Sequence, residues 1–394
     1  MRTQTVAALL VGCFLIVMPG GSLLALNSEV EVEEQVIYSG EGFEGLRGSE
    51  CSISVGVGGV LSVAFPAYRE SEAFPYVAIV DGDQVEIQSL GPGGRNVLCL
   101  SLDADKAGLI HACYTYDEYN PSPGEAPHTG HESNLTYSRQ TATGWTSEHV
   151  IQRSPELVAG RIFIDDEGNP AIVVWSSGML GVYRKTAGGA WQHEAIERPS
   201  ADVTFLDAVA MTRGELAILF TVQLRDEEGY ELRLGFLRDS TWSETVVARS
   251  TGLMYANPRS MAWRGSEEMH VLYTAGENAR WEDARVYHAT CVDGSCSVEG
   301  IAGTYGLSGG IAVSSSGELF ATYASFEPPL RFGDVDLTST IAIQDADSLW
   351  VTLPIRTELL TMPTGLEVAE AGLILVGTQT FSEGGDLSLV RIRY

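Results

Sequence analysis

Aromatic and charged side chains gather in segments whose composition predicts long loops. Trp281 follows Arg280, Phe332 follows Arg331, and Tyr119 lies in a third such segment. An aromatic ring stacks on a sugar or a peptide side chain, while charged groups supply the hydrogen bonds that fix its orientation. We therefore expect these five residues to form a binding surface for a glycan or a protein. The alternative is that each ring packs only against its own loop.

Two short motifs match spacings known from enzymes but lack the elements that such sites need. His128 and His131 have the HxxH spacing of a zinc site, yet their Pro/Gly-rich segment offers no helix to order both rings. The segment 306–310 reads Gly-Leu-Ser-Gly-Gly and matches GxSxG, but the apolar run after it predicts a strand where a nucleophile elbow needs a helix. We expect solvated histidines and a glycine-rich junction, with no bound metal and no assignable catalytic residue.

Three acidic runs, 103–105, 165–169 and 334–336, are candidates for weak calcium binding. None has the complete series of oxygen ligands of a known calcium loop, so ordinary turn residues are the favoured interpretation. We expect no cofactor, with weakly bound calcium as the alternative.

The cysteines predict one specific disulfide. Cys291 and Cys296 flank Asp293-Gly294, the strongest two-residue signal for a hairpin with a type I′ turn. With this turn the two cysteines face each other across the hairpin, at a pair whose side chains approach closely.

A second disulfide would join Cys99 and Cys113, which lie on either side of a predicted turn at 103–108. Cys51 competes for this pairing, because it occupies the position of Cys99 one repeat earlier. Its partner stays open. Disulfides indicate an oxidising compartment, and the lack of any CxxC pair argues against a zinc site.

The N-terminal segment and the net charge limit where the chain works and what it binds. Arg2, the apolar run Val6–Met18 and the break at Pro19 predict a secretory signal peptide over residues 1–25, too short to span a membrane. A lipoprotein anchored at Cys13 is the weaker alternative, because the apolar run continues past that cysteine. The net charge of −28 excludes nucleic acid, since phosphate binding requires clustered cations. We expect a secreted, periplasmic or cell-surface protein that partners a glycan or an envelope or extracellular protein.

An internal repeat of about 50 residues organises the rest of the chain. Each unit has an apolar strand, a glycine-bearing turn and a second strand ending in an aromatic residue: Phe65, Tyr114, Trp175, Phe220, Tyr273 and Tyr323. A second marker opens a later strand of the unit with Trp, at Trp145, Trp191, Trp242 and Trp350, and with Cys296 once. Four short strands per unit and no helical period are typical of a β-propeller blade.

We predict one all-β domain over residues 26–394, a single propeller of seven four-stranded blades. Six or eight blades are alternatives, because the first and last units are the faintest. The last unit ends at Tyr394 without an outer strand, whereas Val32–Ser39 resembles the outer strands of other units. We expect this N-terminal segment to complete the last blade, which closes the ring and removes an exposed sheet edge.

The repeat resembles that of secreted bacterial propellers related to the sialidase-like, Asp-box superfamily, over nearly all of the chain after residue 25. An Asp box places Ser, Asp, Gly and Trp at alternating positions before the outer strand. Thr186–Trp191 keeps Gly and Trp without the Asp, and Gln344–Trp350 keeps Asp and Trp without the Gly. The resemblance implies a propeller fold and, in a sialidase, an Arg-Ile-Pro segment, an Arg triad and a Tyr–Glu pair. The chain has no Arg-Ile-Pro and no assignable triad, so sialidase activity is not expected.

Loop lengths predict which end of the propeller binds a ligand. The first-to-second and third-to-fourth strand turns are short and share one end, whereas the second-to-third connections are long and share the other. These long segments are 66–75, 115–134, 222–231, 275–284 and 324–338. Binding sites usually lie on long loops held by a rigid scaffold. We expect a binding protein, with a polysaccharide hydrolase or lyase as the alternative. Two facing carboxylates with an Arg at the mouth of the central channel would favour the enzyme.

Overall fold

The computed structural model describes residues 6–8, 31–38, 51–56, 59–69, 72–119, 131–154, 158–165, 167–176, 179–186, 188–196, 202–210, 215–224, 229–238, 241–257, 259–265, 268–278, 283–326, 338–344, 349–355, 362–369, 372–378 and 387–393. Every regular element in these ranges is a β-strand, so the all-β prediction is confirmed. Within the same ranges, no helix has the length and hydropathy needed to cross a bilayer.

Four sheets each contain four strands that follow one another along the chain. In chain order these strands are β3 (Ser52–Val55), β4 (Leu61–Arg69), β5 (Glu72–Asp81) and β6 (Gln84–Ser89); β7 (Val97–Ala104), β8 (Ile110–Tyr119), β9 (His131–Thr141) and β10 (Gly144–Ser154); β11 (Val158–Ile164), β12 (Pro170–Ser176), β13 (Met179–Lys185) and β14 (Trp191–Ile196); and β15 (Asp202–Ala210), β16 (Leu216–Gln223), β17 (Tyr230–Arg238) and β18 (Thr241–Ser250).

The remaining strands form two larger sheets. One contains β19 (Met254–Tyr255), β20 (Met261–Arg264), β21 (Glu268–Ala275), β22 (Arg285–Val292), β23 (Ser295–Val313), β24 (Leu319–Ser325), β25 (Thr338–Gln344) and β26 (Trp350–Pro354). The other contains β1 (Val6–Ala8), β2 (Glu31–Tyr38), β27 (Met362–Ala369), β28 (Gly372–Thr378) and β29 (Leu387–Arg393). The long β23 pairs with β22 through its first half and with β24 through its second half, so two repeat units share one sheet.

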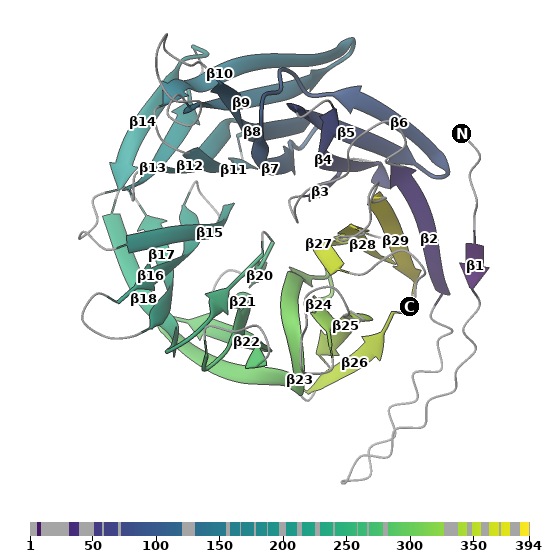
Figure 1. Cartoon of the computed structure of the whole chain (residues 1–394), viewed down its shortest axis with the longest axis vertical. Helices are drawn as coiled ribbons and strands as arrows, with labels where there is room; N and C mark the ends of the chain where they lie inside the picture. The colour runs from purple at the N-terminus through teal and green to yellow at the C-terminus, as the bar shows by residue number, and fades with distance from the viewer. Residues whose placement is uncertain are drawn as a thin grey trace.

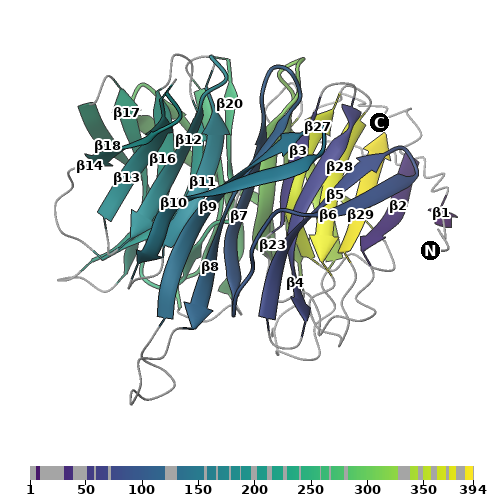
Figure 2. The ribbon, with the colours of Figure 1, turned by 90° about the horizontal axis from the view of Figure 1, so that it is seen from above.

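The sheets stand around a common axis like the blades of a propeller (Figure 1), and their strands run roughly along that axis (Figure 2). The strands nearest the axis, here called the inner strands, are β3, β7, β11, β15, β20, β27 and residues 306–313 of β23. Each inner strand contacts the inner strand of the next unit, and β27 contacts β3. Side chains on these strands can therefore meet around the axis although they are far apart in sequence.

The two ends of the chain meet in one sheet. β2 pairs antiparallel with β29, from Glu31 opposite Arg393 to Tyr38 opposite Leu387. Tyr38 is buried, and its ring centroid lies 4.8 Å from that of Phe65 in the neighbouring sheet. This pairing is the one expected for residues 32–39. The short β1, which lies in the segment predicted as a signal peptide, pairs with the other edge of β2.

A five-residue turn recurs between paired strands at one end of the molecule, here called the tight-turn end; it closes four inner hairpins and, at 186–190, the outer β13–β14 hairpin. In the turn 105–109, the Asp105 N–H donates to Leu109 O at 3.0 Å and the Gly108 N–H to Asp105 O at 2.8 Å. The same two bonds recur in the turns 56–60, 165–169, 186–190 and 314–318. The fourth residue is always glycine, with φ between 79° and 87°, a conformation that costs glycine little.

The acidic turn residues accept hydrogen bonds from their own turns. Oδ1 of Asp105 accepts the N–H groups of residues 107 and 109, and Oδ1 of Asp165 accepts those of residues 167 and 169. These bonds agree with the interpretation as turn residues. Weak calcium binding at 103–105 and 165–169 stays a prediction, and 334–336 lies outside the described residues.

Two segments expected as long loops, 66–75 and 115–134, are strand at both of their described ends. β4 and β5 pair as far as Arg69 opposite Glu72, and β8 and β9 as far as Tyr119 opposite His131. The prolines in 66–75 made a loop the natural expectation, but Pro66 and Pro75 face each other in the hairpin. β3 pairs with β4 only as far as Ala64, so Pro66 lies beyond that ladder, and next to β6 the Leu90 N–H still donates to Pro75 O at 3.0 Å, a bond that needs no proline N–H.

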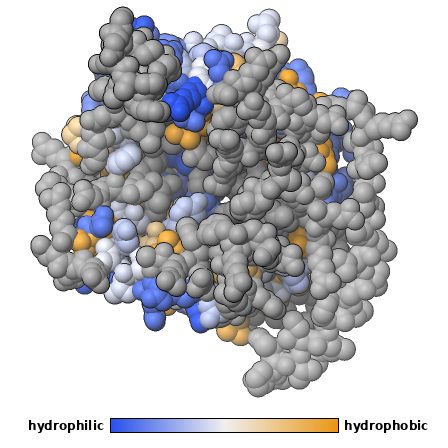
Figure 3. All heavy atoms as spheres, in the orientation of Figure 1, coloured by the Kyte–Doolittle hydropathy of each residue, from blue (hydrophilic) through white to orange (hydrophobic). Residues whose placement is uncertain are grey.

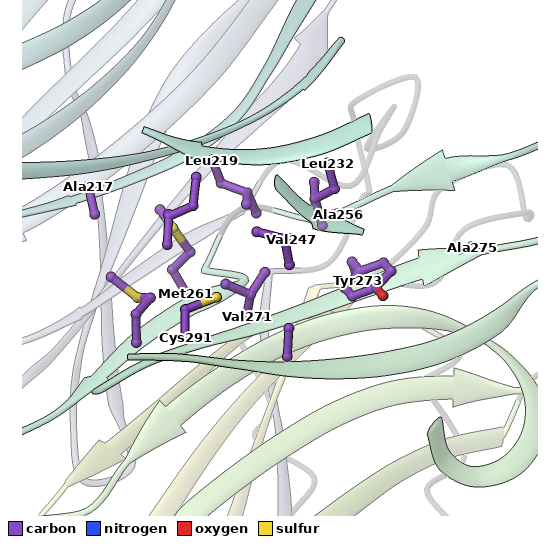
Figure 4. Packing of buried hydrophobic residues seen from close by; sticks show 13 residues of the cluster. Ala217, Leu219, Leu232, Val247, Ala256, Met261, Val271, Tyr273, Ala275 and Cys291 are labelled. Atoms are coloured by element: carbon purple, nitrogen blue, oxygen red, sulfur yellow. The ribbon is translucent and has the colours of Figure 1, made fainter. Parts of the chain in front are cut away.

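Hydrophobic residues fill the interfaces between neighbouring sheets. In the cluster of Figure 4, Leu219 and Leu232 come from one sheet, and Met261 and Val271 come from the next. Among the exposed large hydrophobic residues, Val36, Met179 and Val246 lie on three different sheets and Val292 and Val298 on a fourth, and on the face seen in Figure 3 the orange residues are scattered among polar ones. The described surface therefore offers no broad apolar patch.

The tryptophan marker has a structural role between sheets. Three of these indoles donate Nε1–H to a side-chain oxygen on the outer strand of the preceding unit: Trp145 to Gln88 at 2.8 Å, Trp191 to Glu148 at 2.9 Å and Trp350 to Glu299 at 2.8 Å. The indole of Trp242 donates to Glu244 of its own strand instead, at 2.8 Å. The period of the marker thus reflects a repeated contact between neighbouring units.

The disulfide between Cys291 and Cys296 is confirmed, and the two residues face each other in the β22–β23 register. Asp293 and Gly294 have φ values of 50° and 77°, as a type I′ turn requires. Cys51 and Cys113 are buried. The side chain of Cys99 lies outside the described residues, so its pairing with Cys113 stays a prediction.

Candidate functional site

The residues predicted to bind a ligand fall in parts of the chain that the structure does not describe. Arg280, Trp281, Arg331 and Phe332 lie outside the described residues, and only the backbone of Tyr119, at the end of β8, is described. The binding surface at this end of the propeller therefore stays a prediction.

The side chains of the two candidate metal ligands are also not described by the structure. His128 lies outside the described residues, and only the backbone of His131, at the start of β9, is described. The GxSxG serine can be placed: Ser308 lies within β23, fully buried, and its N–H donates to Thr274 Oγ1 at 2.7 Å. A buried serine inside a strand does not form a nucleophile elbow.

Within the described residues, one arginine joins strands on opposite sides of the propeller axis. Arg259 precedes β20, and its Nη2 donates to Ile53 O on β3 and to Leu102 O on β7, the latter at 3.4 Å. Its Nη1 lies 3.3 Å from Glu367 Oε2 on β27. Because β20 faces β3 and β7 across the ring (Figure 1), this side chain crosses the axis.

The charge of this guanidinium acts on the carboxyl groups of Asp103 and Glu367, and burial raises the pKa of both. For Glu367, the charge of Arg259 opposes that rise and the charge of Asp103 adds to it. For Asp103, Arg259 and hydrogen bonds from the N–H groups of Ile164 and Ala104 lower the pKa again. Arg259 and Glu367 keep 34% and 28% of their side-chain surface exposed, so water reaches the pair. We call Arg259, Asp103 and Glu367 the axial cluster.

The axial cluster lies nearer the tight-turn end. Asp103 is the second-to-last residue of β7 and pairs with His111, directly before the turn 105–109. Glu367 lies two residues before the end of β27 and pairs with Ile374. The cluster therefore lies in the half of the axis opposite the predicted binding loops.

Polar side chains on the inner strands, Asp103 of the axial cluster among them, hold neighbouring inner strands together. Oδ2 of Asp103 accepts the Ile164 N–H of β11 at 2.7 Å, and Oδ2 of Asp207 accepts the Ser260 N–H at 3.0 Å. Serine hydroxyls do the same elsewhere: Ser52 accepts from Leu102 at 3.0 Å and Ser101 from Ile162 at 3.2 Å. These bonds satisfy N–H groups at strand edges that no fifth strand covers.

The axial cluster places two carboxyl groups with different hydrogen-bond partners beside the Arg259 cation. Asp103 is held by two backbone N–H groups, whereas Glu367 touches only Arg259 among the described contacts. Glu367 is thus the carboxyl group better placed to exchange a proton or to accept a ligand hydroxyl. Arg259 has a φ of 68°, and such strain in a non-glycine residue is found disproportionately at functional sites.

Sequence reasoning had no means of finding the axial cluster. Arg259 is 206 residues from Ile53 and 157 from Leu102, and no motif links these positions. The one usable signal was indirect, since an acid near the end of an inner strand, as at Asp103 and Glu367, is unusual in a predicted buried strand.

No protein family model matches the chain, and no curated protein sequence matches it. Several solved structures share its fold. A protein of unknown function from Dyadobacter fermentans is 13% identical with a TM-score of 0.54, over 92% of this chain and 99% of that one. An ulvan lyase from a new polysaccharide lyase family is 12% identical with a TM-score of 0.60, over 88% and 94%. A Trypanosoma rangeli sialidase is 13% identical with a TM-score of 0.49, over 99% of this chain and 58% of that one. At such identities the first two likenesses show a β-propeller-like fold and nothing finer.

Proposed function

We propose that this protein is an exported β-propeller of seven four-stranded blades that binds carbohydrate at the end of its axis opposite the tight turns. The blade count follows if β23 is divided between two blades and β2 is taken as the outer strand of the last. The pairing of β2 with β29 and the contact of β27 with β3 support a closed ring.

The observation that carries the binding proposal is the position of Arg259. Its side chain crosses the axis in the tight-turn half and ties β20 to β3, β7 and β27. A ligand that approached along the axis from the tight-turn end would contact the Arg259 side chain and the hydrogen-bonded turns. A ligand is therefore better received from the other end, where the connections containing Tyr119, Trp281 and Phe332 begin.

The choice of carbohydrate rests on two lines of support. The predicted loop residues pair aromatic rings with charged groups, a combination suited to sugars. One solved structure of the same fold is a polysaccharide lyase. The predicted signal peptide and the Cys291–Cys296 disulfide agree with a protein that works outside the cytoplasm, where such polymers occur.

A glycan array probed with residues 26–394 tests this proposal. We expect binding to a restricted set of glycans that soluble competitor removes. Binding to none of the glycans, with the protein shown to be folded, would overturn the carbohydrate proposal. Capture of an envelope protein instead would move the function to protein recognition on the same face.

A second candidate function, a polysaccharide hydrolase or lyase, is favoured by the axial cluster itself. Two carboxyl groups with raised pKa values beside an arginine could divide acid and base roles. Release of new chain ends from polysaccharides would reveal the activity. Glu367→Gln should abolish it in a folded protein, whereas Glu86→Gln, on an outer strand, should not. Turnover unaffected by Glu367→Gln would exclude this cluster as the catalytic site.

A further inference from the structure

Two histidines lie buried, ring against ring, where the β20–β22 strands pack against the β24–β26 strands. His270 on β21 and His288 on β22 are both 0% exposed. Their ring centroids are 5.1 Å apart and their planes 14° apart. Leu272, which pairs with His288, belongs to an apolar cluster that includes residues of the next unit. A charge created here would lie in an apolar interface.

The hydrogen bonds fix where the protons of this pair must be. His288 Nδ1 lies 2.9 Å from Glu299 Oε1, and a carboxylate accepts, so Nδ1 carries the proton. The neutral His288 ring then has an acceptor at Nε2, which lies 2.9 Å from His270 Nδ1. His270 must therefore donate from Nδ1, which leaves its Nε2 as an unprotonated acceptor. That nitrogen is buried and has no hydrogen-bond partner in the structure.

The charged groups around the pair come from three strands. Glu268 Oε1 on β21 lies 3.7 Å from His270 Nε2, and Arg264 on β20 holds both oxygens of Glu268, at 2.7 and 2.8 Å. Glu299 lies on β23. From β25 and β26 the neighbours Gln344 and Trp350 are neutral. Burial, His288 and Arg264 together lower the pKa of His270, and burial lowers the pKa of His288 against the pull of Glu299.

The same pair touches the contact between the two units. Glu299 Oε1 accepts the Trp350 Nε1–H at 2.8 Å and the Gln344 Nε2–H at 3.4 Å, both from the neighbouring unit. The Trp350 ring meets the His288 ring edge-on, with centroids 5.0 Å apart. The proton state of the pair is thus coupled through one carboxylate to the groups that join the units.

We propose that the His270–His288 pair makes the contact between the β20–β22 and β24–β26 strands acid-sensitive, with one proton bound at His270 Nε2 on opening. In the closed state that nitrogen is buried, and Glu268 Oε1, 3.7 Å away, makes no hydrogen bond to it and is already paired with Arg264, so it offsets a new charge only in part. In an opened state the imidazolium is hydrated, so acid favours opening. This inference does not depend on the ligand.

A comparable histidine elsewhere lacks the vacant nitrogen. His111 on β8 is also buried, but its Nδ1 lies 2.7 Å from the Tyr137 hydroxyl and its Nε2 3.4 Å from Asp105 Oδ2. A proton added to His111 therefore lies within hydrogen-bond distance of the Asp105 carboxylate. The vacant buried nitrogen at His270 is what singles out its interface.

Hydrogen–deuterium exchange on residues 26–394 tests the proposal. Opening that takes up one proton becomes about tenfold more frequent for each pH unit below the ordinary histidine pKa. We expect protection of β25 and β26 amides, corrected for intrinsic exchange, to fall about tenfold per unit between pH 6 and pH 4.5. Amides of β16 and β17, in a sheet without histidine, should keep their protection. An equal loss in both places, or none in either, would overturn the proposal.

His270→Asn supplies the matched variant, because its amide nitrogen can still donate to His288 but cannot titrate. It should keep the protection seen at neutral pH and show a weaker pH dependence in β25 and β26, with only the contribution of His288 left. His193→Asn, at an exposed position on β14, should change neither. Should His270→Asn fail to fold, nitrogen NMR of the wild-type histidines decides: both rings must be Nδ1–H tautomers at pH 7. A proton on His270 Nε2 at that pH would refute the proton assignment and the proposal with it.

Discussion

Removal of the Arg259 side chain is the most direct test of the axial cluster. Arg259→Ala deletes the donors to Ile53 O and Leu102 O and the ion pair with Glu367. Hydrogen bonds that involve a charged group contribute about 1.5–3 kcal/mol each. The Leu102 bond is long, at 3.4 Å, and 34% of the Arg259 side chain is exposed, so we expect a total loss of about 3 kcal/mol. For a chain of this length, that corresponds to a melting temperature lower by about 4 °C.

The assay is differential scanning calorimetry of Arg259→Ala, Arg259→Gly and a surface control. Glycine removes the same contacts but relieves the strain of a φ of 68°, so it should recover about 1 kcal/mol relative to alanine. Arg238→Ala breaks an exposed ion pair with Glu215 and should cost less than about 1 kcal/mol. Melting temperatures of both Arg259 variants within 1 °C of the wild type would refute the reasoning.

The pH dependence of the Arg259→Ala deficit has a definite sign. Because the folded-state pKa of Glu367 is raised, the folded protein binds that proton more tightly than the unfolded chain does. The free energy of unfolding therefore falls as pH rises through the folded-state pKa. Removing Arg259 takes away the charge that lowers the pKa of both Glu367 and Asp103. The deficit should be larger at pH 7 than at pH 4, and the opposite trend would contradict this account.

Three further experiments follow from the fold and the proposed site. Replacing both Cys291 and Cys296 by serine should cost at most about 2 kcal/mol in chemical denaturation, because the bond closes a short loop; a larger loss would point to native contacts of the sulfurs. Deleting residues 26–40 removes β2 and should abolish soluble folded protein, so an unchanged melting temperature and solubility would rule out closure by this strand. Once a glycan ligand is known, Trp281→Ala should weaken its binding by about 1–3 kcal/mol, whereas Asp293→Ala at the tight-turn end should not; titration calorimetry showing the reverse would put the site on the wrong face.

The features predicted from the sequence are those governed by local chemistry or by the repeat. The Asp293-Gly294 pair dictates a type I′ turn, and that turn alone brings Cys291 and Cys296 together. The strand Glu31–Tyr38, predicted over residues 32–39, was recognisable because it shares its pattern with other outer strands. Where the local signal was misread, as with Pro66 and Pro75, the deciding fact was the pairing around each proline: β3 ends before Pro66, and Pro75 takes part through its carbonyl oxygen. No property of the prolines themselves encodes that pairing.

The axial cluster and the histidine pair escaped prediction for a different reason. His270 and His288 lie 18 residues apart on paired strands, but they are diagonal neighbours, since His270 pairs with Thr290 and His288 with Leu272. Their contact depends on which face both strands bury, which the sequence pattern did not settle. The contacts of Arg259 depend on strands that are far apart in sequence, because its partners lie on β3, β7 and β27.

The polar residues on the inner strands bear on where recognition can take place. Asp103, Asp207, Ser52 and Ser101 each accept a backbone N–H of the next inner strand, and Arg259 is bound to two carbonyl oxygens. A side chain committed to its neighbours in this way cannot turn to a ligand without unpairing a strand edge. Of the axial cluster, Glu367 alone has no backbone partner among the described contacts. Because the described side chains at the axis serve cohesion in this way, the proposed binding of a large ligand needs groups outside the axis, and this is the physical reason why we propose the long connections for it.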